Sequence, residues 1–134
     1  MSTIKKSAMK KNKPWAFIVE DDVSIINAYV AKFKHEKIPL KVAEDGDKAI
    51  DVLKGVDLPS VILLDLMLPK RNGFEVLEII KKDERLKEIP VFIFTNLGQE
   101  VDRKKGEQLG VVEYLVKANT KIDDVVKKVN RYMK

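Results

Sequence analysis

Short, continuous apolar runs are the feature that most constrains how this chain can fold. Residues 61–64 and residues 16–19 are apolar throughout. Unbroken runs of this length without helical spacing are typical of strands buried on both faces of a sheet. Stripes of helical spacing separate the runs, so the pattern predicts βαβ units and a parallel sheet covered on both faces. The expected strands are residues 14–19, 39–43, 61–64, 90–94 and 111–116.

Five amphipathic stretches are expected to form the helices that follow these strands. In the first, Ile26, Tyr29, Val30 and Phe33 recur at helical spacing. Short polar side chains are expected to cap helix starts, and glycines are expected to end helices. The apolar stripes lie within residues 26–33, 49–53, 74–80, 96–109 and 122–133, with Asp22, Asp45 or Asp47, and Asn96 as caps and Gly55 and Gly110 as terminators.

Length and composition indicate one globular domain, residues 14–134, with a core of useful size. The 134 residues are 45% hydrophobic and 35% charged, and they contain no cysteine. Disulfides, thiolate metal sites and thiol nucleophiles are thereby excluded. No apolar run approaches the length of a membrane span, and no secretory signal is recognisable, so a cytoplasmic location without membrane contact is expected.

The net charge of +5 belongs to the first thirteen residues. This segment carries five lysines and no acid, and removing them from the 26 basic residues leaves 21, equal to the 21 acids. We expect a disordered, solubilising extension here. Loose contact with nucleic acid or an acidic partner is the alternative interpretation. The lysines are Lys5, Lys6, Lys10, Lys11 and Lys13.

Charged residues gather where the predicted strands end. Asp65 directly follows the run 61–64, and Glu20 and Asp21 follow the run 16–19. The carboxyl ends of the strands are where open α/β sheets bind ligands. Carboxylates that lie this close do not ionise together without a cation. The sequence therefore predicts a divalent metal beside a reactive aspartate, with Thr95 and Lys117 ending two further strands at the same edge.

Four motifs, in order and each at a strand end, resemble the receiver domain of two-component response regulators, in particular single-domain, chemotaxis-regulator-like members. The resemblance runs from about Trp15 to the carboxyl terminus and makes residues 14–134 a receiver domain. It implies a doubly wound, flavodoxin-like α/β fold with five parallel strands in the order 2-1-3-4-5 and five helices. The motifs are Ile18-Val19-Glu20-Asp21-Asp22, Leu64-Asp65-Leu66-Met67-Leu68-Pro69 with Asn72-Gly73, Phe94-Thr95, and Tyr114-Leu115-Val116-Lys117.

The resemblance implies a phosphorylation-controlled signalling switch. Asp65 would accept a phosphoryl group from a phosphohistidine on a sensor histidine kinase or histidine phosphotransfer protein. Asp21, Asp65 and the backbone carbonyl of Met67 would bind Mg²⁺ or Mn²⁺, and Glu20 would act through water. Lys117 would pair with Asp65 and then with the phosphoryl group.

The same resemblance implies how the signal would leave the site. Thr95 would bond a phosphoryl oxygen, and Tyr114 would turn inward as Thr95 moves. A downstream protein would bind the face formed by the fourth helix, fifth strand and fifth helix. Nucleic acid is not an expected partner of this chain alone. The face includes Arg103, Lys104 and Lys105.

Three residues depart from the family pattern. Asn96 replaces the usual small residue, Ala118 replaces the usual proline, and Leu68 stands where the family often has methionine.

Several rival functions stand beside this interpretation. A metal-dependent aspartyl-phosphate hydrolase would need an acid where Met67 stands, and a nucleotide-binding enzyme would need phosphate-cradling donors after the first strand. A phosphorylation-independent interaction module is a third alternative. We expect no dedicated enzyme, although the chain would catalyse its own phosphoryl transfer and dephosphorylation. A stand-alone regulator is favoured over a receiver excised from a longer protein.

Overall fold

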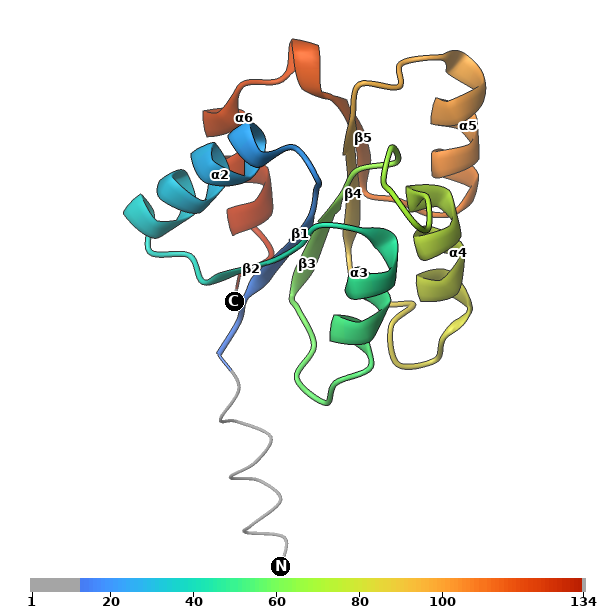
Figure 1. The fold of residues 1–134 in the computed structure, drawn as a ribbon, viewed down its shortest axis with the longest axis horizontal. Helices are drawn as coiled ribbons and strands as arrows, with labels where there is room; N and C mark the ends of the chain where they lie inside the picture. Colours follow the sequence, from blue (N-terminus) through green and yellow to red (C-terminus); the bar gives the residue numbers. More distant parts are fainter. Residues whose placement is uncertain (1–12, 134) are drawn as a thin grey trace, which may run out of the picture.

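A computed structural model describes residues 13–133 as a five-stranded parallel sheet with helices on both faces (Figure 1). The strands are β1 (Ala16–Val19), β2 (Leu40–Ala43), β3 (Val61–Leu64), β4 (Val91–Thr95) and β5 (Glu113–Val116). Their order is β2-β1-β3-β4-β5, which confirms the predicted fold class. The expected basic extension lies outside the described residues except for Lys13.

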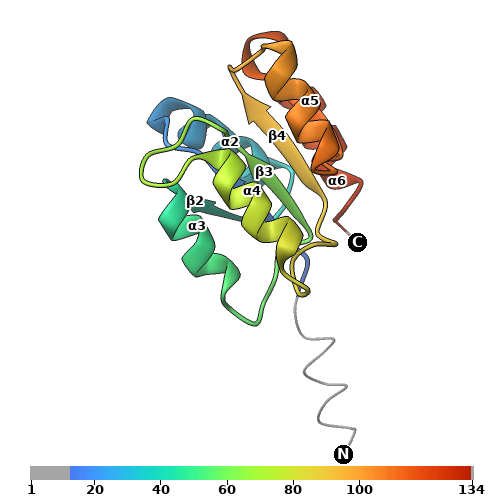
Figure 2. The same ribbon diagram turned by 90° about the vertical axis from the view of Figure 1, so that its right-hand side faces the viewer.

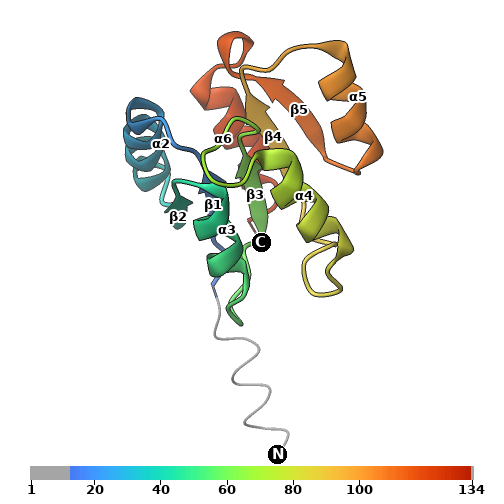
Figure 3. The ribbon, with the colours of Figure 1, turned by 45° about the vertical axis from the view of Figure 1, so that its right-hand side comes forward.

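Five α-helices and one short 3₁₀-helix connect the strands. Figure 1 shows α2 and α6 on one side of the sheet, and Figures 2 and 3 show α3, α4 and α5 along the other. Within the described part of the chain, no helix is both long enough and apolar enough to cross a membrane. The helices are α2 (Val23–His35), α3 (Gly46–Leu53), α4 (Gly73–Lys82), α5 (Glu100–Gln108), η1 (Lys117–Asn119) and α6 (Ile122–Asn130).

The apolar runs divide their side chains between two cores because successive strand residues point to opposite faces. In β1, Phe17 and Val19 join the core beneath α3, α4 and α5, whereas Ala16 and Ile18 join the core beneath α2 and α6. All four residues of β3 are at most 3% exposed. The central strands are therefore packed on both faces, and the residues that directly follow them are held in place by these strands.

Side-chain caps begin three of the helices. Asp22 Oδ1 accepts hydrogen bonds from the backbone N–H groups of Ser24 and Ile25. Asp45, one of two predicted candidates, accepts one from the N–H of Lys48 at 2.7 Å. The sequence analysis missed a reciprocal capping box between Asn72 and Glu75 at the start of α4.

The predicted start of the fourth helix at Asn96 is wrong. This helix, α5, begins at Glu100, and its N-cap Gln99 makes no side-chain cap hydrogen bond. Residues 96–99 form a loop, and the backbone of Leu97 has one local and one tertiary partner there. Its N–H donates to Thr95 Oγ1 at 3.4 Å, and its carbonyl accepts from the hydroxyl of Tyr114.

The expected strand boundaries were also slightly wrong. Pro90 precedes β4 instead of opening it, consistent with its missing N–H group. The fifth strand begins at Glu113, because the N–H of Val111 still bonds to the carbonyl of Gly106 at the end of α5. Gly110 ends that helix as predicted, with a φ of 82°.

Gly73 lets the start of α4 approach the end of β3, and its replacement tests that contact. A Cβ at Gly73 would collide with the backbone carbonyl oxygen of Asp65 and lie 2.5 Å from Leu66 Cα. We expect Gly73→Ala to lower the free energy of unfolding in urea by at least about 2 kcal/mol, because backbone cannot move aside cheaply.

Gly98→Ala is the matched control for this substitution. The nearest atom to a Cβ at Gly98 would be a Val116 methyl at 3.9 Å, an ordinary contact. This variant should stay within about 0.5 kcal/mol of the wild type. Equal stabilities for the two variants would contradict the close approach.

Candidate functional site

The strand register brings the predicted acidic residues together. Val19 of β1 pairs with Leu64 of β3, so the next residues, Glu20 and Asp65, emerge side by side at the sheet edge. The backbone N–H of Asp65 donates to the carbonyl of Val19 at 3.0 Å, which extends the strand pairing into the site. Neighbouring strands are only about 5 Å apart, so both carboxylates enter one small volume.

Burial sets this edge apart from the rest of the molecule. Four polar or charged residues are buried in the described chain, and three of them are Glu20, Asp65 and Thr95. The fourth, Asp45, is a helix cap. Buried carboxylates are costly unless they are paired, so a partner has to be present nearby.

Lys117 is that partner for both acids. Its Nζ lies 2.8 Å from Asp65 Oδ2 and 2.7 Å from Glu20 Oε1. Thr95 pairs with Val116 across β4 and β5, which delivers Lys117 to the same edge. The sequence analysis anticipated the contact with Asp65 but missed the one with Glu20.

Burial and neighbouring charges shift the pKa values of both Glu20 and Lys117. Burial raises the pKa of Glu20 and outweighs the opposing effects of Lys117 and of the Asp22 N–H group, and the charge of Asp65 raises it further. For Lys117, burial lowers the pKa, but the bonds to Asp65 and Glu20 together outweigh it and leave that pKa raised. The lysine is therefore held charged, while an ionised Glu20 needs more positive charge than Lys117 supplies.

The acids also form a candidate cation site. One carboxylate oxygen from each of Glu20, Asp21 and Asp65 lies within 4.8 Å of the others. Glu20 Oε1 is buried and forms an ion pair with Lys117 Nζ at 2.7 Å, outside hydrogen-bond geometry. Three carboxylates against one ammonium fit a divalent cation with oxygen ligands. Asp21 is exposed, which opens the site to solvent.

Met67 lies at the rim of this cluster. Its backbone N–H donates to Asp65 Oδ1 at 3.1 Å, and its side chain is 55% exposed. The metal-ligand role of its carbonyl oxygen stays a prediction.

Thr95 and Tyr114 are connected through Leu97. Thr95 is fully buried and Tyr114 is 6% exposed. Leu97 bonds to both, through its N–H group to Thr95 and through its carbonyl to the hydroxyl of Tyr114. Burial and the charge of Asp102 raise the pKa of Tyr114, against the opposing charge of Arg103. Sequence reasoning placed Leu97 inside a helix and so missed this connection.

The basic residues of the predicted partner face have different surroundings. Arg103 Cζ lies 4.9 Å from the centre of the Tyr114 ring. Lys105 Nζ lies 4.4 Å from the centre of the Phe74 ring, whereas Lys104 is exposed. These three side chains therefore do not form one uniform charged patch.

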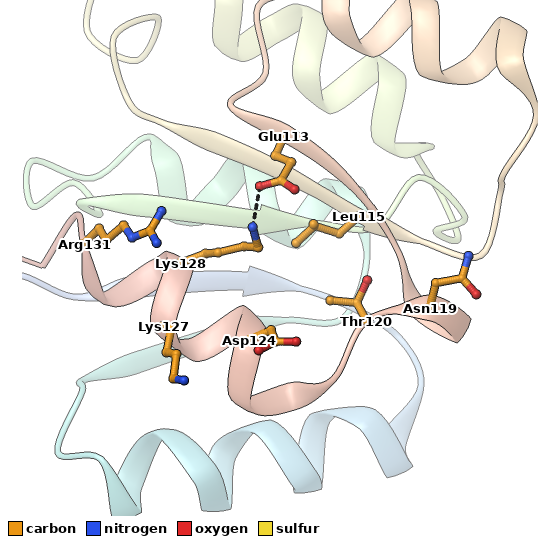
Figure 4. Close-up of a pocket in the computed structure, with 8 residues that line it drawn as sticks. All are labelled: Glu113, Leu115, Asn119, Thr120, Asp124, Lys127, Lys128 and Arg131. Atoms are coloured by element: carbon orange, nitrogen blue, oxygen red, sulfur yellow. Dashed lines mark hydrogen bonds and ion pairs between the residues drawn. The ribbon is translucent and has the colours of Figure 1, made fainter.

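A groove of about 360 Å³ between β5 and α6 lies apart from the acids (Figure 4). Figure 4 shows the ion pair between Lys128 and Glu113, 2.9 Å apart, joining α6 to β5 across it. Its other lining residues are Leu115, Asn119, Thr120, Asp124, Lys127 and Arg131. The candidate site is thus a carboxylate cluster at the sheet edge and not this groove.

Comparison with known sequences agrees with this geometry. Residues 16–130 match the family model described as "Response regulator receiver domain". The chain is 38% identical over 110 residues to the "DNA-binding dual master transcriptional regulator RpaA" of Synechocystis sp., a match covering 78% of this chain and 43% of that protein. It is 34% identical over 100 residues to the "Transcriptional regulatory protein CpxR" of Escherichia coli K12, covering 75% and 41%. The chain therefore spans less than half the length of these relatives.

Solved structures show the same fold. A Francisella response regulator receiver domain superposes with a TM-score of 0.80 at 28% identity, covering 90% of this chain and 97% of that one. The Mn²⁺-bound form of the response regulator Rcp1 superposes with a TM-score of 0.74 at 32% identity, covering 88% and 91%. The second of these is a relative that binds a divalent metal.

Removing the shared cation tests the electrostatic account of the site. Lys117→Ala leaves Glu20 and Asp65 buried without their ammonium partner, so we expect a loss of about 2–4 kcal/mol in unfolding free energy. Lys128→Ala, which removes the exposed pair with Glu113, should cost no more than about 1 kcal/mol. Urea denaturation at neutral pH in EDTA measures both. Similar losses in the two variants would contradict the buried network.

Proposed function

Because the chain belongs to the response regulator receiver domain family of two-component signalling, we propose that Asp65 is its phosphoacceptor and that phosphorylation switches a partner-binding face. The observation that carries this proposal is the buried Asp65 carboxylate, 4% exposed and 2.8 Å from Lys117 Nζ. A charge-paired carboxylate at the end of a central strand is both nucleophilic and held in place.

The proposed transfer proceeds from a phosphohistidine on a sensor histidine kinase or histidine phosphotransfer protein. A carboxylate oxygen of Asp65 attacks phosphorus, the P–N bond breaks, and its electron pair returns to the imidazole, which takes up a proton. The product is an acyl phosphate on Asp65. As the negative charge passes to the phosphoryl group, the ammonium of Lys117 moves from the Asp65 carboxylate to a phosphoryl oxygen.

Residues for a divalent cation are part of the proposal. Asp21, Asp65 and the carbonyl oxygen of Met67 would bind Mg²⁺ or Mn²⁺ directly, and Glu20 would act through water. When bound, the cation supplies positive charge to the phosphoryl oxygens. The excess of carboxylates over ammonium groups supports this assignment.

Thr95 and Tyr114 are proposed as the switch. The hydroxyl of Thr95 would turn from the N–H group of Leu97 to a phosphoryl oxygen, which removes one of the two bonds that fix Leu97. The other bond joins Leu97 to Tyr114, so the position of the phenol would respond. A downstream protein would recognise the face of α5, β5 and α6. The same proposal places the protein in the cytoplasm.

Phosphorylation of the purified chain tests the acceptor. With Mg²⁺ and phosphoramidate, the wild type should gain the mass of one phosphoryl group, and EDTA should prevent the gain. Asp65→Asn should gain none, because its amide cannot attack phosphorus. Asp47→Asn, which alters an exposed aspartate in the first turn of α3, is the control and should behave like the wild type. A comparable mass gain in Asp65→Asn would sink the assignment.

Metal affinity is tested by two neighbouring aspartates. Asp21→Asn removes one carboxylate from the cluster, so we expect Mg²⁺ affinity, measured by calorimetry, to fall at least about tenfold. Asp22→Asn keeps the helix cap, since asparagine caps as well as aspartate, and should change affinity by less than about threefold. Equal effects would show that Asp21 is not a ligand.

A further inference from the structure

Helix α5 has fewer buried residues than any other α-helix of the described chain. Gly106 is its only buried residue, whereas each of the other four α-helices buries at least two. Its N-cap, Gln99, contributes no side-chain hydrogen bond. Elements with few buried contacts open locally at low free energy. The seating of α5 therefore depends on a small number of contacts with β4 and β5.

Gly106 makes room for Tyr114. A Cβ at this position would lie 2.7 Å from Ile93 Cδ1 and 3.3 Å from Tyr114 Cδ2. Glycine inside a helix is less favourable than alanine. Gly46 and Gly73 avoid that penalty as the first residues of their helices, but Gly106 lies inside α5. The space that Gly106 leaves free is shared by the Ile93 side chain and the Tyr114 ring, which both lie against the helix.

Arg103 covers the same ring from the preceding turn of α5. Residues three apart share a helix face, and Arg103 Cζ lies 4.9 Å from the centre of the Tyr114 ring. Its Nη1 also donates to the carbonyl of Tyr114 at 3.5 Å. A guanidinium over an aromatic face is an attractive cation–π contact.

The hydroxyl end of Tyr114 is fixed as well, since it donates to the carbonyl of Leu97. Protein groups thus hold the ring, the main chain and the hydroxyl of one residue. The contacts of Tyr114 with Arg103, Gly106 and Leu97 come from α5 and from the loop before it.

We propose that Arg103 and Gly106 are positioning residues that clamp Tyr114 in its buried orientation, and that this clamp seats α5 on the sheet. The buried orientation then does not require phosphorylation. Arg103, which lies at the surface above the ring, transmits a movement of Tyr114 to a partner. The clamp stands on the contacts alone, while its consequence for signalling rests on the proposed function.

Fluorine NMR of protein labelled with 3-fluorotyrosine tests the clamp without any phosphodonor. The chain has three tyrosines, and Tyr114→Phe assigns the resonance of interest. In Arg103→Ala, this resonance should move toward its position in unfolded protein, and amide exchange in α5 should accelerate about three- to tenfold. Arg103→Lys keeps the charge without the planar group and should shift the resonance partway. Lys104→Ala, at an exposed position of the same helix, should leave it unchanged.

Filling the space beside the ring is an independent test. Gly106→Val should displace the Tyr114 resonance in the same direction as Arg103→Ala. Glu107→Val places the same residue at an exposed position of α5 and controls for lost helix propensity. An unchanged Tyr114 resonance in both Arg103→Ala and Gly106→Val would overturn the clamp. Equal shifts in Lys104→Ala or Glu107→Val would also overturn it, because they would show general loosening of the helix. If Gly106→Val does not fold, Arg103→Lys and Arg103→Ala decide.

A second measurement separates the clamp from the proposed function. With Mg²⁺ and phosphoramidate, the Tyr114 resonance of Arg103→Lys should move back toward the wild-type position, because Tyr114 would turn inward as Thr95 moves to the phosphoryl group. A variant that is phosphorylated on Asp65 without this return would overturn the signalling consequence. Failure of the wild type to become phosphorylated would overturn the proposed function and with it that consequence, while the first measurement would still decide the clamp.

Discussion

The contact of Lys117 with both Glu20 and Asp65 is the interaction on which the rest of the site depends. Two buried carboxylates share one ammonium at 2.7 and 2.8 Å, so the group keeps a net negative charge before Asp21 is counted. Isolated buried charges cost several kcal/mol each, and only part of this is offset here. The pKa of Glu20 is raised, mainly by burial, because Lys117 only partly offsets the cost of burying its charge. An arrangement of this kind attracts cations and responds strongly to any change of charge on Asp65.

The sheet makes this arrangement possible because its strands are parallel and in register. Glu20 and Asp65 follow the paired residues Val19 and Leu64, and Lys117 follows the residue that pairs with Thr95. A slip of one residue would turn each of these side chains to the opposite face. The charged residues that end the apolar runs oppose a slip, because it would draw Glu20 or Asp65 between the two buried cores. The packing that fixes the strand register therefore also fixes the positions of the site residues.

The sequence was sufficient to predict Glu20, Asp65, Thr95 and Lys117 at the sheet edge, because each directly follows an apolar run. The strand order was predicted from the resemblance to receiver domains. The sequence was not sufficient for contacts that depend on tertiary reach, such as the ion pair of Glu20 with Lys117. The false helix start at Asn96 has a related cause. Local preference there allows a helix, but the carbonyl of Leu97 accepts from the hydroxyl of Tyr114 in β5, a contact that the local sequence does not show. The roles of the site residues in phosphoryl transfer stay predictions until they are measured.

Rigidity is unevenly distributed between the site and the face proposed to carry its output. β1 and β3 are buried along their whole length, so a new charge on Asp65 cannot move them without disrupting both cores. The loop of residues 96–99 and α5 have fewer constraints, since α5 buries one residue. Local rearrangement needs the least free energy in elements that have few buried contacts. Under the proposed function, a charge change at Asp65 would therefore reach α5 through Thr95 and Leu97, without a motion of the sheet.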